Sequence, residues 1–354
     1  MSKIIVSVSN DLVSDQRVSK VCKTLHSNGH EIVLIGRLLH DRDELQRPYP
    51  FKRMRLFFNK GPLFYFELNL RLFIKILGLR VDILLANDLD TLLANYLASR
   101  IKRTKLVYDS HEYFTEVPEL KNRFSRRIWL AVERTIFPRL KNVYTVGPAL
   151  ARIYSNKYNV RVNVIRNTPV KKEKRGTSKG YLFYQGAINK GRGLPQLIEA
   201  IEGTSYTLKI AGDGDIKKEI MDLIQKLDMT KQVELLGRLS PEILHRYTCG
   251  AAIGFNLLEQ DSLNYYYSLA NKTFDYIQAE VPQVSMNFPE YADLIKKYKV
   301  GELIDDLKKE SILKAIKDIE ENAERYVDDM KLASSELVWQ TEAQKLTAIF
   351  ANLD

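Results

Sequence analysis

The chain alternates short apolar runs with amphipathic stretches of helical period along most of its 354 residues. The apolar runs are aliphatic or β-branched on both faces, which is typical of strands buried in a parallel sheet. Repeated strand–helix units of this kind predict an α/β fold with a doubly wound sheet. In the first half the predicted strands are 4–9, 31–35, 83–86, 106–108, 143–146 and 162–165, and helices among them are 16–27, 91–99 and 126–141.

The same alternation restarts after a break in composition. Residues 169–180 are rich in Lys and Arg, with Pro, Gly, Ser and Thr and almost no apolar side chain, so they are predicted to be a linker. Two Rossmann-like domains follow, 1–168 and 181–334, with a last amphipathic helix, about 335–354, expected to pack back on the first domain across a cleft. The second domain has predicted strands at 181–184, 207–211, 233–236, 252–256 and 283–286, and helices at 194–201, 216–227, 242–249 and 272–279.

Charge and composition restrict the classes of partner. The net charge of +10 favours an anionic partner, whether nucleic acid, phospholipid headgroups or a phosphorylated substrate. No apolar run reaches the roughly 18 residues that span a bilayer, so we expect a cytoplasmic protein. Cys22 and Cys249 have no disulfide or zinc spacing, and no metal site is expected.

A glycine-rich segment, YQGAINKGRG at 184–193, follows one predicted strand and precedes a helix. Glycines such as Gly186 let the backbone approach a ligand closely, and amides at a helix N-terminus attract phosphate. Lys190 and Arg192 would add charge-assisted donors for a diphosphate. The alternative is an ordinary turn with solvated charges, because the spacing matches neither the dinucleotide fingerprint nor the P-loop.

Two further segments lie where ligands bind in open α/β sheets, at the carboxyl ends of strands or at helix starts. Gly212 belongs to AGDG at 211–214, and Asn271 and Lys272 begin a helix with Asp275 one turn in. The Asp275 carboxylate could accept both hydroxyls of a ribose. The alternative is that it only stabilises the helix dipole.

In the first half, Asp88 and His111 each follow a predicted strand. Asp88 is the candidate for contact with an acceptor. His111 is a candidate catalytic residue, with a structural histidine or strand-end cap as the alternative. Arg17 lies after the first strand, where capping and solvation are the alternative to a site, and Ser14 is the expected helix N-cap.

Residues 53–80 interleave cations with aromatic side chains. Such a segment can lie in a membrane interface, or it can be a core-facing helix with a solvated basic side. Both interpretations stay open. The aromatic residues are Phe57, Phe58, Phe64, Tyr65, Phe66 and Phe73.

The order and spacing of several motifs resemble the GT-B glycosyltransferases of the group 1, family 4-like superfamily. These motifs are SDQRV at 14–18, NGHEIV at 28–33, VYDSHE at 107–112, the stretch 186–200, GDG at 212–214 and NKTFDY at 271–276.

The resemblance implies roles for individual residues. Arg192 falls at the family's phosphate-binding lysine, Asp275 at its ribose-binding glutamate, and His111 beside the donor sugar. Two positions depart from the pattern. Ala187 replaces the usual arginine, for which Lys190 is the candidate substitute, and Tyr267 replaces an earlier glutamate.

The function implied is transfer of a sugar from a nucleotide diphosphate sugar to a glycan or lipid-linked acceptor hydroxyl, with retention and without a metal or other cofactor. An inverting enzyme would need a general base such as Asp88 or His111. The expected location is the cytoplasm, with peripheral attachment to an anionic membrane surface. A GT-B sugar-nucleotide epimerase and a basic nucleic-acid-binding protein remain as alternatives, although no nucleic-acid reading motif is recognisable.

Overall fold

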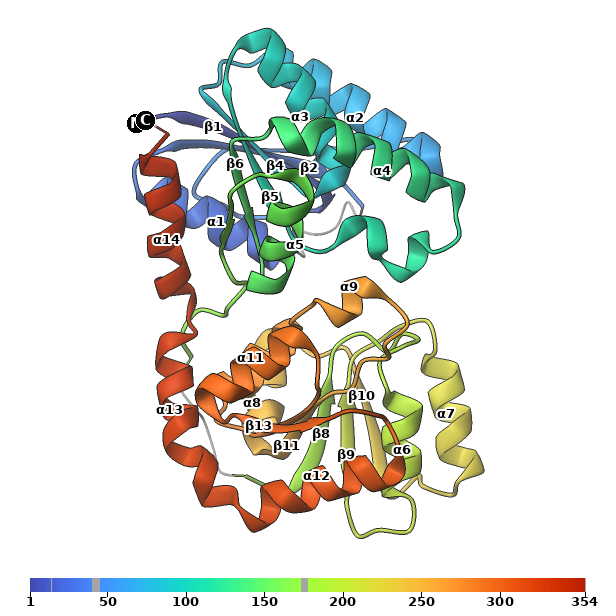
Figure 1. Ribbon diagram of the computed structural model, residues 1–354. Coiled ribbons are helices and arrows are strands. Elements are labelled where there is room, and N and C mark those ends of the chain that lie inside the picture. Colours follow the sequence, from blue (N-terminus) through green and yellow to red (C-terminus); the bar gives the residue numbers. More distant parts are fainter. Residues whose placement is uncertain (14, 40–44, 173–177, 354) are drawn as a thin grey trace. The chain divides into compact units, whose positions relative to one another are not determined.

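The computed structural model describes residues 1–13, 15–39, 45–172 and 178–353. They form two compact units (Figure 1), Met1–Asn167 with Thr341–Asp354, and Thr168–Gln340. Part of the predicted linker, 173–177, lies outside the described residues, as does Ser14.

The first unit is built on a parallel sheet of seven strands in the order β3-β2-β1-β4-β5-β6-β7. Its central strands are buried on both faces, and Ile4, Ile5 and Val6 are fully inaccessible. The strands are β1 Lys3–Asp11, β2 Glu31–Arg37, β3 Phe51–Met54, β4 Ile83–Asn87, β5 Lys105–Ser110, β6 Asn142–Thr145 and β7 Val162–Val164. The helices are α1 Gln16–Ser27, α2 Gly61–Leu77, α3 Leu89–Lys102, α4 Phe124–Ile136 and α5 Pro148–Tyr158, with 3-10 turns η1 Phe114–Glu116, η2 Pro118–Leu120 and η3 Phe137–Arg139.

The second unit repeats the plan with six parallel strands in the order β10-β9-β8-β11-β12-β13. The strands are β8 Tyr181–Gln185, β9 Leu208–Ala211, β10 Val233–Gly237, β11 Ala251–Asn256, β12 Gln283–Met286 and β13 Gly301–Ile304. The helical elements are α6 Leu194–Ile201, α7 Lys217–Lys226, α8 Pro241–Gly250, α9 Leu263–Tyr266, α10 Asn271–Gln278, α11 Pro289–Tyr298, α12 Lys309–Glu321, η4 Ala323–Tyr326 and α13 Val327–Glu336. The predicted α/β class with two Rossmann-like sheets is confirmed.

The last predicted helix, about 335–354, corresponds to α14 and begins four residues before it. After α13 the chain is interrupted at Leu337 and Val338, and α14 spans Trp339–Ala351. From Thr341 onward the chain belongs to the first unit, where Leu346 and Phe350 are fully buried. The predicted helix 126–141 was also too long, because α4 ends at Ile136 and a 3-10 turn precedes β6.

The helix starts show how local sequence sets the element bounds. Asp15 caps α1, because its carboxylate accepts the Val18 amide at 3.0 Å. In both sheets the strand order reverses once, between β1 and β4 and between β8 and β11, and ligands of such folds bind beside this reversal at the carboxyl ends of the strands.

Among the described residues, no helix is both long and apolar enough to cross a membrane.

Candidate functional site

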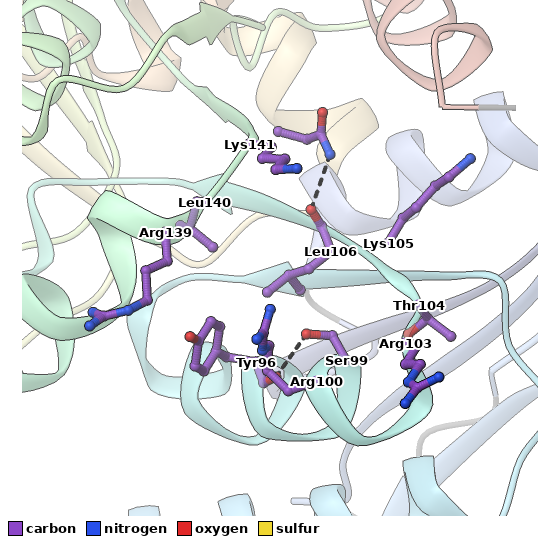
Figure 2. A pocket seen from close by; sticks show the side chains of 11 residues that line it. Tyr96, Ser99, Arg100, Arg103, Thr104, Lys105, Leu106, Arg139, Leu140 and Lys141 are labelled. Atoms are coloured by element: carbon purple, nitrogen blue, oxygen red, sulfur yellow. Dashed lines mark hydrogen bonds between the residues drawn. The ribbon is translucent and has the colours of Figure 1, made fainter.

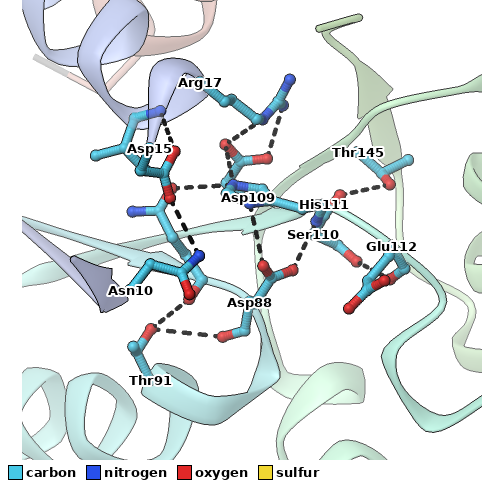
Figure 3. A network of polar contacts seen from close by, with 12 residues as sticks. Asn10, Asp15, Arg17, Asp88, Thr91, Asp109, Ser110, His111, Glu112 and Thr145 are labelled. Carbon is cyan, nitrogen blue, oxygen red and sulfur yellow. Dashed lines mark hydrogen bonds and ion pairs between the residues drawn. The ribbon is translucent and has the colours of Figure 1, made fainter. Parts of the chain in front are cut away.

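In the first unit, the two predicted residues Asp88 and His111 lie together at the carboxyl edge of the sheet (Figure 3). Asp88 follows β4 and His111 follows β5, and these strands are neighbours. One Asp88 oxygen lies 3.0 Å from His111 Nδ1, and the other accepts the His111 backbone amide at 2.8 Å. Asp88 therefore holds both the ring and the backbone of His111.

The second ring nitrogen of His111 also faces acceptors. Nε2 lies 3.2 Å from Asp109 Oδ2 and 3.2 Å from Asn87 Oδ1. The Asn87 amide nitrogen donates to the Ser7 carbonyl at 2.9 Å, which turns its oxygen toward the ring. Burial alone would lower the pKa of His111, but the charges of Asp88 and Asp109 raise it well above its usual value. Both ring nitrogens thus face oxygen acceptors, an arrangement that favours the doubly protonated ring.

Arg17 completes this network as the buried partner of Asp109. Its Nε and NH2 groups donate to the two Asp109 oxygens at 3.0 and 2.7 Å, and NH1 donates to the Ile165 carbonyl at 3.0 Å. The side chains are 4% and 0% exposed. Burial would raise the pKa of Asp109, but Arg17 and His111 lower it to about 2. Arg17 is thus neither a capping nor a solvated residue.

Asp90 is a titratable residue beside the network that the sequence did not single out. It is buried in the first turn of α3, and burial, with the charge of Asp88, raises its pKa to about 7. Asp88 itself has a φ of 58°, a conformation that costs free energy for residues other than glycine. The chain therefore has both backbone strain and a carboxyl whose pKa is raised to about 7 at one edge of the sheet.

In the second unit, the glycine-rich segment Gly186–Gly193 connects β8 to α6 and packs against the turn after β9. Gly212 has a φ of 156°, and a Cβ there would lie 1.8 Å from the Gly186 carbonyl oxygen. Only glycine allows these two backbones to come so close. The structure thus brings the predicted Gly186 and Gly212 together at the carboxyl edge of the sheet.

Two cations, Arg192 within this loop and Lys272 at the start of α10, have no counter-anion among the described residues. The Lys272 ammonium lies 3.7 Å from the centre of the Tyr184 ring, and the Arg192 guanidinium lies 4.7 Å from that of Tyr265. Burial, with the charge of Arg192, lowers the pKa of Lys272 well below its usual value. The buried Arg192 Nε has no hydrogen-bond partner, and neither side chain forms an ion pair within the described parts of the chain. Such a pair fits a ligand with two negative charges.

Asp275 lies on the same helix as Lys272 but is engaged elsewhere. Its Oδ2 accepts the Gln185 amide at 3.0 Å, and Oδ1 lies 3.8 Å from Lys172 Nζ. Gln185 in turn accepts a hydrogen bond from Thr248 at 2.7 Å. The carboxylate is therefore oriented in advance at the end of β8.

The remaining predicted positions lie around this loop. Lys190 and Asn271 are exposed, at the loop and at the start of α10. Ala187 is also exposed, and its carbonyl accepts a hydrogen bond from the Tyr184 hydroxyl at 2.7 Å. The Tyr267 ring packs against the Tyr266 ring, with 4.9 Å between the ring centres. Over the described ranges, no group of His, Cys, Asp and Glu is arranged to hold a metal ion.

Comparisons with known proteins agree with this architecture. The family model described as Glycosyltransferase Family 4 matches residues 16–168, and that of Glycosyl transferases group 1 matches residues 166–331. No curated protein sequence matches the chain significantly.

Similar solved structures span the whole chain. Anabaena HepE in complex with UDP has a TM-score of 0.76 at 13% identity, covering 99% of this chain and 100% of that one. Sucrose-phosphate synthase from Thermosynechococcus elongatus has a TM-score of 0.80 at 13% identity, with 100% and 99% coverage. WaaG, a glycosyltransferase involved in lipopolysaccharide biosynthesis, has a TM-score of 0.72 at 13% identity, with 98% and 99% coverage. With the two family models together spanning residues 16–331, the chain belongs to the GT-B glycosyltransferases of the group 1, family 4-like superfamily.

Proposed function

We propose that the enzyme transfers a sugar from a uridine diphosphate sugar to an acceptor hydroxyl, and that the second unit binds the nucleotide. The observation that carries the proposal is the pair Lys272 and Arg192, two cations without an anion beside a glycine-rich loop. Cations placed in advance stabilise a departing diphosphate and can replace a metal ion. The complex of Anabaena HepE with UDP supports the choice of nucleotide.

Retention of anomeric configuration is supported by the state of the candidate bases. Both His111 nitrogens face acceptors, and both Asp88 oxygens accept from His111. Neither group is free to remove a proton from an acceptor, as inversion would require. We infer that the leaving phosphate oxygen takes that proton.

A thermal-shift screen of UDP, GDP, dTDP and CMP tests the nucleotide assignment. UDP should raise the melting temperature most, because a ligand that binds only the native state stabilises it. Incubation with UDP-sugars should then release UDP only when an acceptor glycan is present. Absence of stabilisation by any nucleoside diphosphate would contradict the proposal, and release of an altered free sugar without acceptor would indicate an epimerase.

We further propose that Asp275 binds the ribose. Asp275→Asn should lower the affinity for UDP by about 1 kcal/mol, since an amide oxygen accepts more weakly than a carboxylate. Binding of the 2′,3′-dideoxy analogue, measured by calorimetry, should be unchanged. An equal loss with both nucleotides would remove Asp275 from the ribose site.

The acceptor is proposed to be lipid-linked and reached at an anionic membrane, and helices α2, α3 and α4 form the contact surface. They pack side by side (Figure 1), α2 against α3 and α3 against α4. Their acidic residues, Glu67, Asp90 and Glu133, are all buried. The charged residues that are exposed on these helices are all basic, namely Lys75, Arg100, Arg127 and Arg134.

Apolar side chains are also exposed on this three-helix surface. On α2 they recur every three or four residues and form one stripe, with Phe66 67% and Ile74 60% exposed. Others on the surface are Leu63, Leu70, Leu97, Ile101, Phe124 and Ile128. An apolar stripe with an entirely basic surround complements an anionic bilayer.

The structure changes which part of segment 53–80 can take part. Arg53 lies in β3 and pairs with Asp11 at 3.0 Å, and Phe64 is buried in the core. These residues hold the fold together rather than face a membrane. Phe57 and Phe66, by contrast, are exposed.

Phe66→Glu combined with Lys75→Glu should greatly reduce co-sedimentation with phosphatidylglycerol vesicles. Each cation near such a surface contributes about 1 kcal/mol, and the aromatic area adds to this. Binding of the unchanged enzyme should weaken with salt. The matched control is Met221→Glu with Lys226→Glu on α7, both exposed. An unchanged enzyme that ignores these vesicles even at low salt would refute the membrane contact.

A further inference from the structure

A basic pocket of about 730 Å³ opens at the amino ends of β5 and β6 (Figure 2). It is lined by the end of α3, the start of β5 and the segment between α4 and β6. His111 follows the opposite end of β5, about 20 Å away at the usual rise of a strand. The pocket is therefore distinct from the carboxyl edge that carries the candidate site.

Five cations line this pocket, and no carboxylate does. They are Arg100, Arg103, Lys105, Arg139 and Lys141. Throughout the described ranges, none of them forms an ion pair. Charges of one sign around one cavity repel one another, and an anionic ligand would relieve this repulsion.

The carboxyl end of α3 accounts for only two of these five cations. Arg100 and Arg103 lie at the carboxyl end of α3, where cations complement the helix dipole. Lys105 begins a strand, and Arg139 and Lys141 come from a separate segment that follows α4. Three stretches of chain thus contribute cations to the lining of one cavity, around which the side chains spread in different directions (Figure 2).

A polar atom in the lining also lacks a partner. The Thr104 hydroxyl oxygen is buried and makes no hydrogen bond. By contrast, Ser99 donates to the Tyr96 carbonyl at 2.7 Å, and Asn142 donates to the Leu106 carbonyl at 3.4 Å. The Thr104 hydroxyl is inaccessible to solvent as it stands, so its side chain would have to turn toward the cavity before it could donate to a ligand oxygen.

We propose that this pocket binds a phosphoryl-bearing anion, either the phosphate of a lipid headgroup or a soluble phosphate ester. Guanidinium groups bind phosphate oxygens through paired hydrogen bonds, and the lining holds three of them, on Arg100, Arg103 and Arg139, the last of which also donates to the Thr135 carbonyl. The volume lies in the range of small-molecule sites. A lipid source is compatible with the position of exposed Ile101 between Arg100 and Arg103, at the edge of the three-helix surface.

Calorimetric titration of the full chain with pyrophosphate and with glycerol 1-phosphate, in excess UDP, tests the proposal. Arg103→Gln with Arg139→Gln should weaken binding about tenfold or more, because charge-assisted hydrogen bonds are lost. The control Arg161→Gln with Lys226→Gln removes the same charge from exposed sites elsewhere and should bind like the unchanged enzyme. Equal affinity of all three proteins, or equal loss in both variants, would overturn the proposal.

Vesicles separate the two sources of phosphate. The same three proteins are sedimented with phosphatidylglycerol–phosphatidylcholine vesicles and with phosphatidylcholine alone. If only the pocket variant loses binding to the anionic vesicles, the pocket is supported and its ligand is a lipid headgroup. If only the pocket variant loses binding to the soluble esters, and vesicle binding is unchanged, the pocket is supported and its ligand is a free ester. The UDP-induced rise in melting temperature is recorded in parallel, so that failure of nucleotide binding and failure of the pocket are seen separately.

Discussion

Replacement of both Arg192 and Lys272 by alanine is expected to reduce the affinity for UDP by roughly 3–6 kcal/mol, because each loses charge-assisted contacts to the diphosphate. Binding of uridine should be almost unchanged. Calorimetry with both ligands measures the difference, and Lys226→Ala, on an exposed position of α7, is the control. Equal losses for uridine and UDP would remove the two cations from the phosphate site.

The same two cations, Arg192 and Lys272, predict that UDP binding is coupled to the uptake of a proton. In the free enzyme, burial and the charge of Arg192 lower the pKa of Lys272. A diphosphate would favour the charged ammonium and raise that pKa, so UDP binding above the free pKa should take up a proton. Titrations in two buffers of different ionisation enthalpy would show it as a buffer-dependent heat. A heat that does not depend on the buffer would place the diphosphate away from Lys272.

Asp109→Ala should destabilise the first unit by roughly 3–5 kcal/mol, because it leaves the buried Arg17 guanidinium without its partner. Urea unfolding at neutral pH measures this loss. Glu119→Ala, which removes an exposed carboxylate of the same unit, should cost little. The double variant Arg17→Met with Asp109→Leu should lose less than Asp109→Ala. If the loss of unfolding free energy in the double variant equalled the sum of the losses from the changes at each position alone, a coupled ion pair would be contradicted.

The pKa shifts in this network also predict how stability depends on pH. The pKa of Asp109 is lowered to about 2, so its contribution is complete above about 4 and is lost as the pH falls toward 2. The pKa of His111 is raised, so its contribution is complete below roughly 6.5 and is lost as the pH rises through the raised value. The network is therefore fully stabilising between these limits.

The sequence predicted the central strands because a buried strand reads as an unbroken apolar run. β3 and β13 were missed because their four-residue sequences, FKRM and GELI, contain charged residues and no unbroken apolar run. The start of α14 was predicted four residues early, because Leu337 and Val338 continue its apolar pattern although they lie outside the helix.

The candidate site likewise contains some residues that could be predicted from the sequence and others that could not. Positions at strand ends, such as Asp88 and His111, could be predicted because the topology of an open sheet brings strand ends to one edge. The pairing of Arg17 with Asp109 could not, because it joins residues 92 positions apart in the interior. The burial of Asp90 was equally hidden, since its sequence context is that of an ordinary acidic first turn.

The packing of α14 affects the order in which the molecule can be completed during synthesis. The first unit uses Leu346 and Phe350 as fully buried core residues, and the Arg166 amide donates to Glu342 at 2.9 Å. These residues emerge from the ribosome only after the whole second unit has been translated. The first unit to be synthesised is therefore the last to be finished, and the apolar surface that Leu346 and Phe350 cover stays exposed until then. A nascent chain released early would keep that apolar surface exposed to chaperones and proteases.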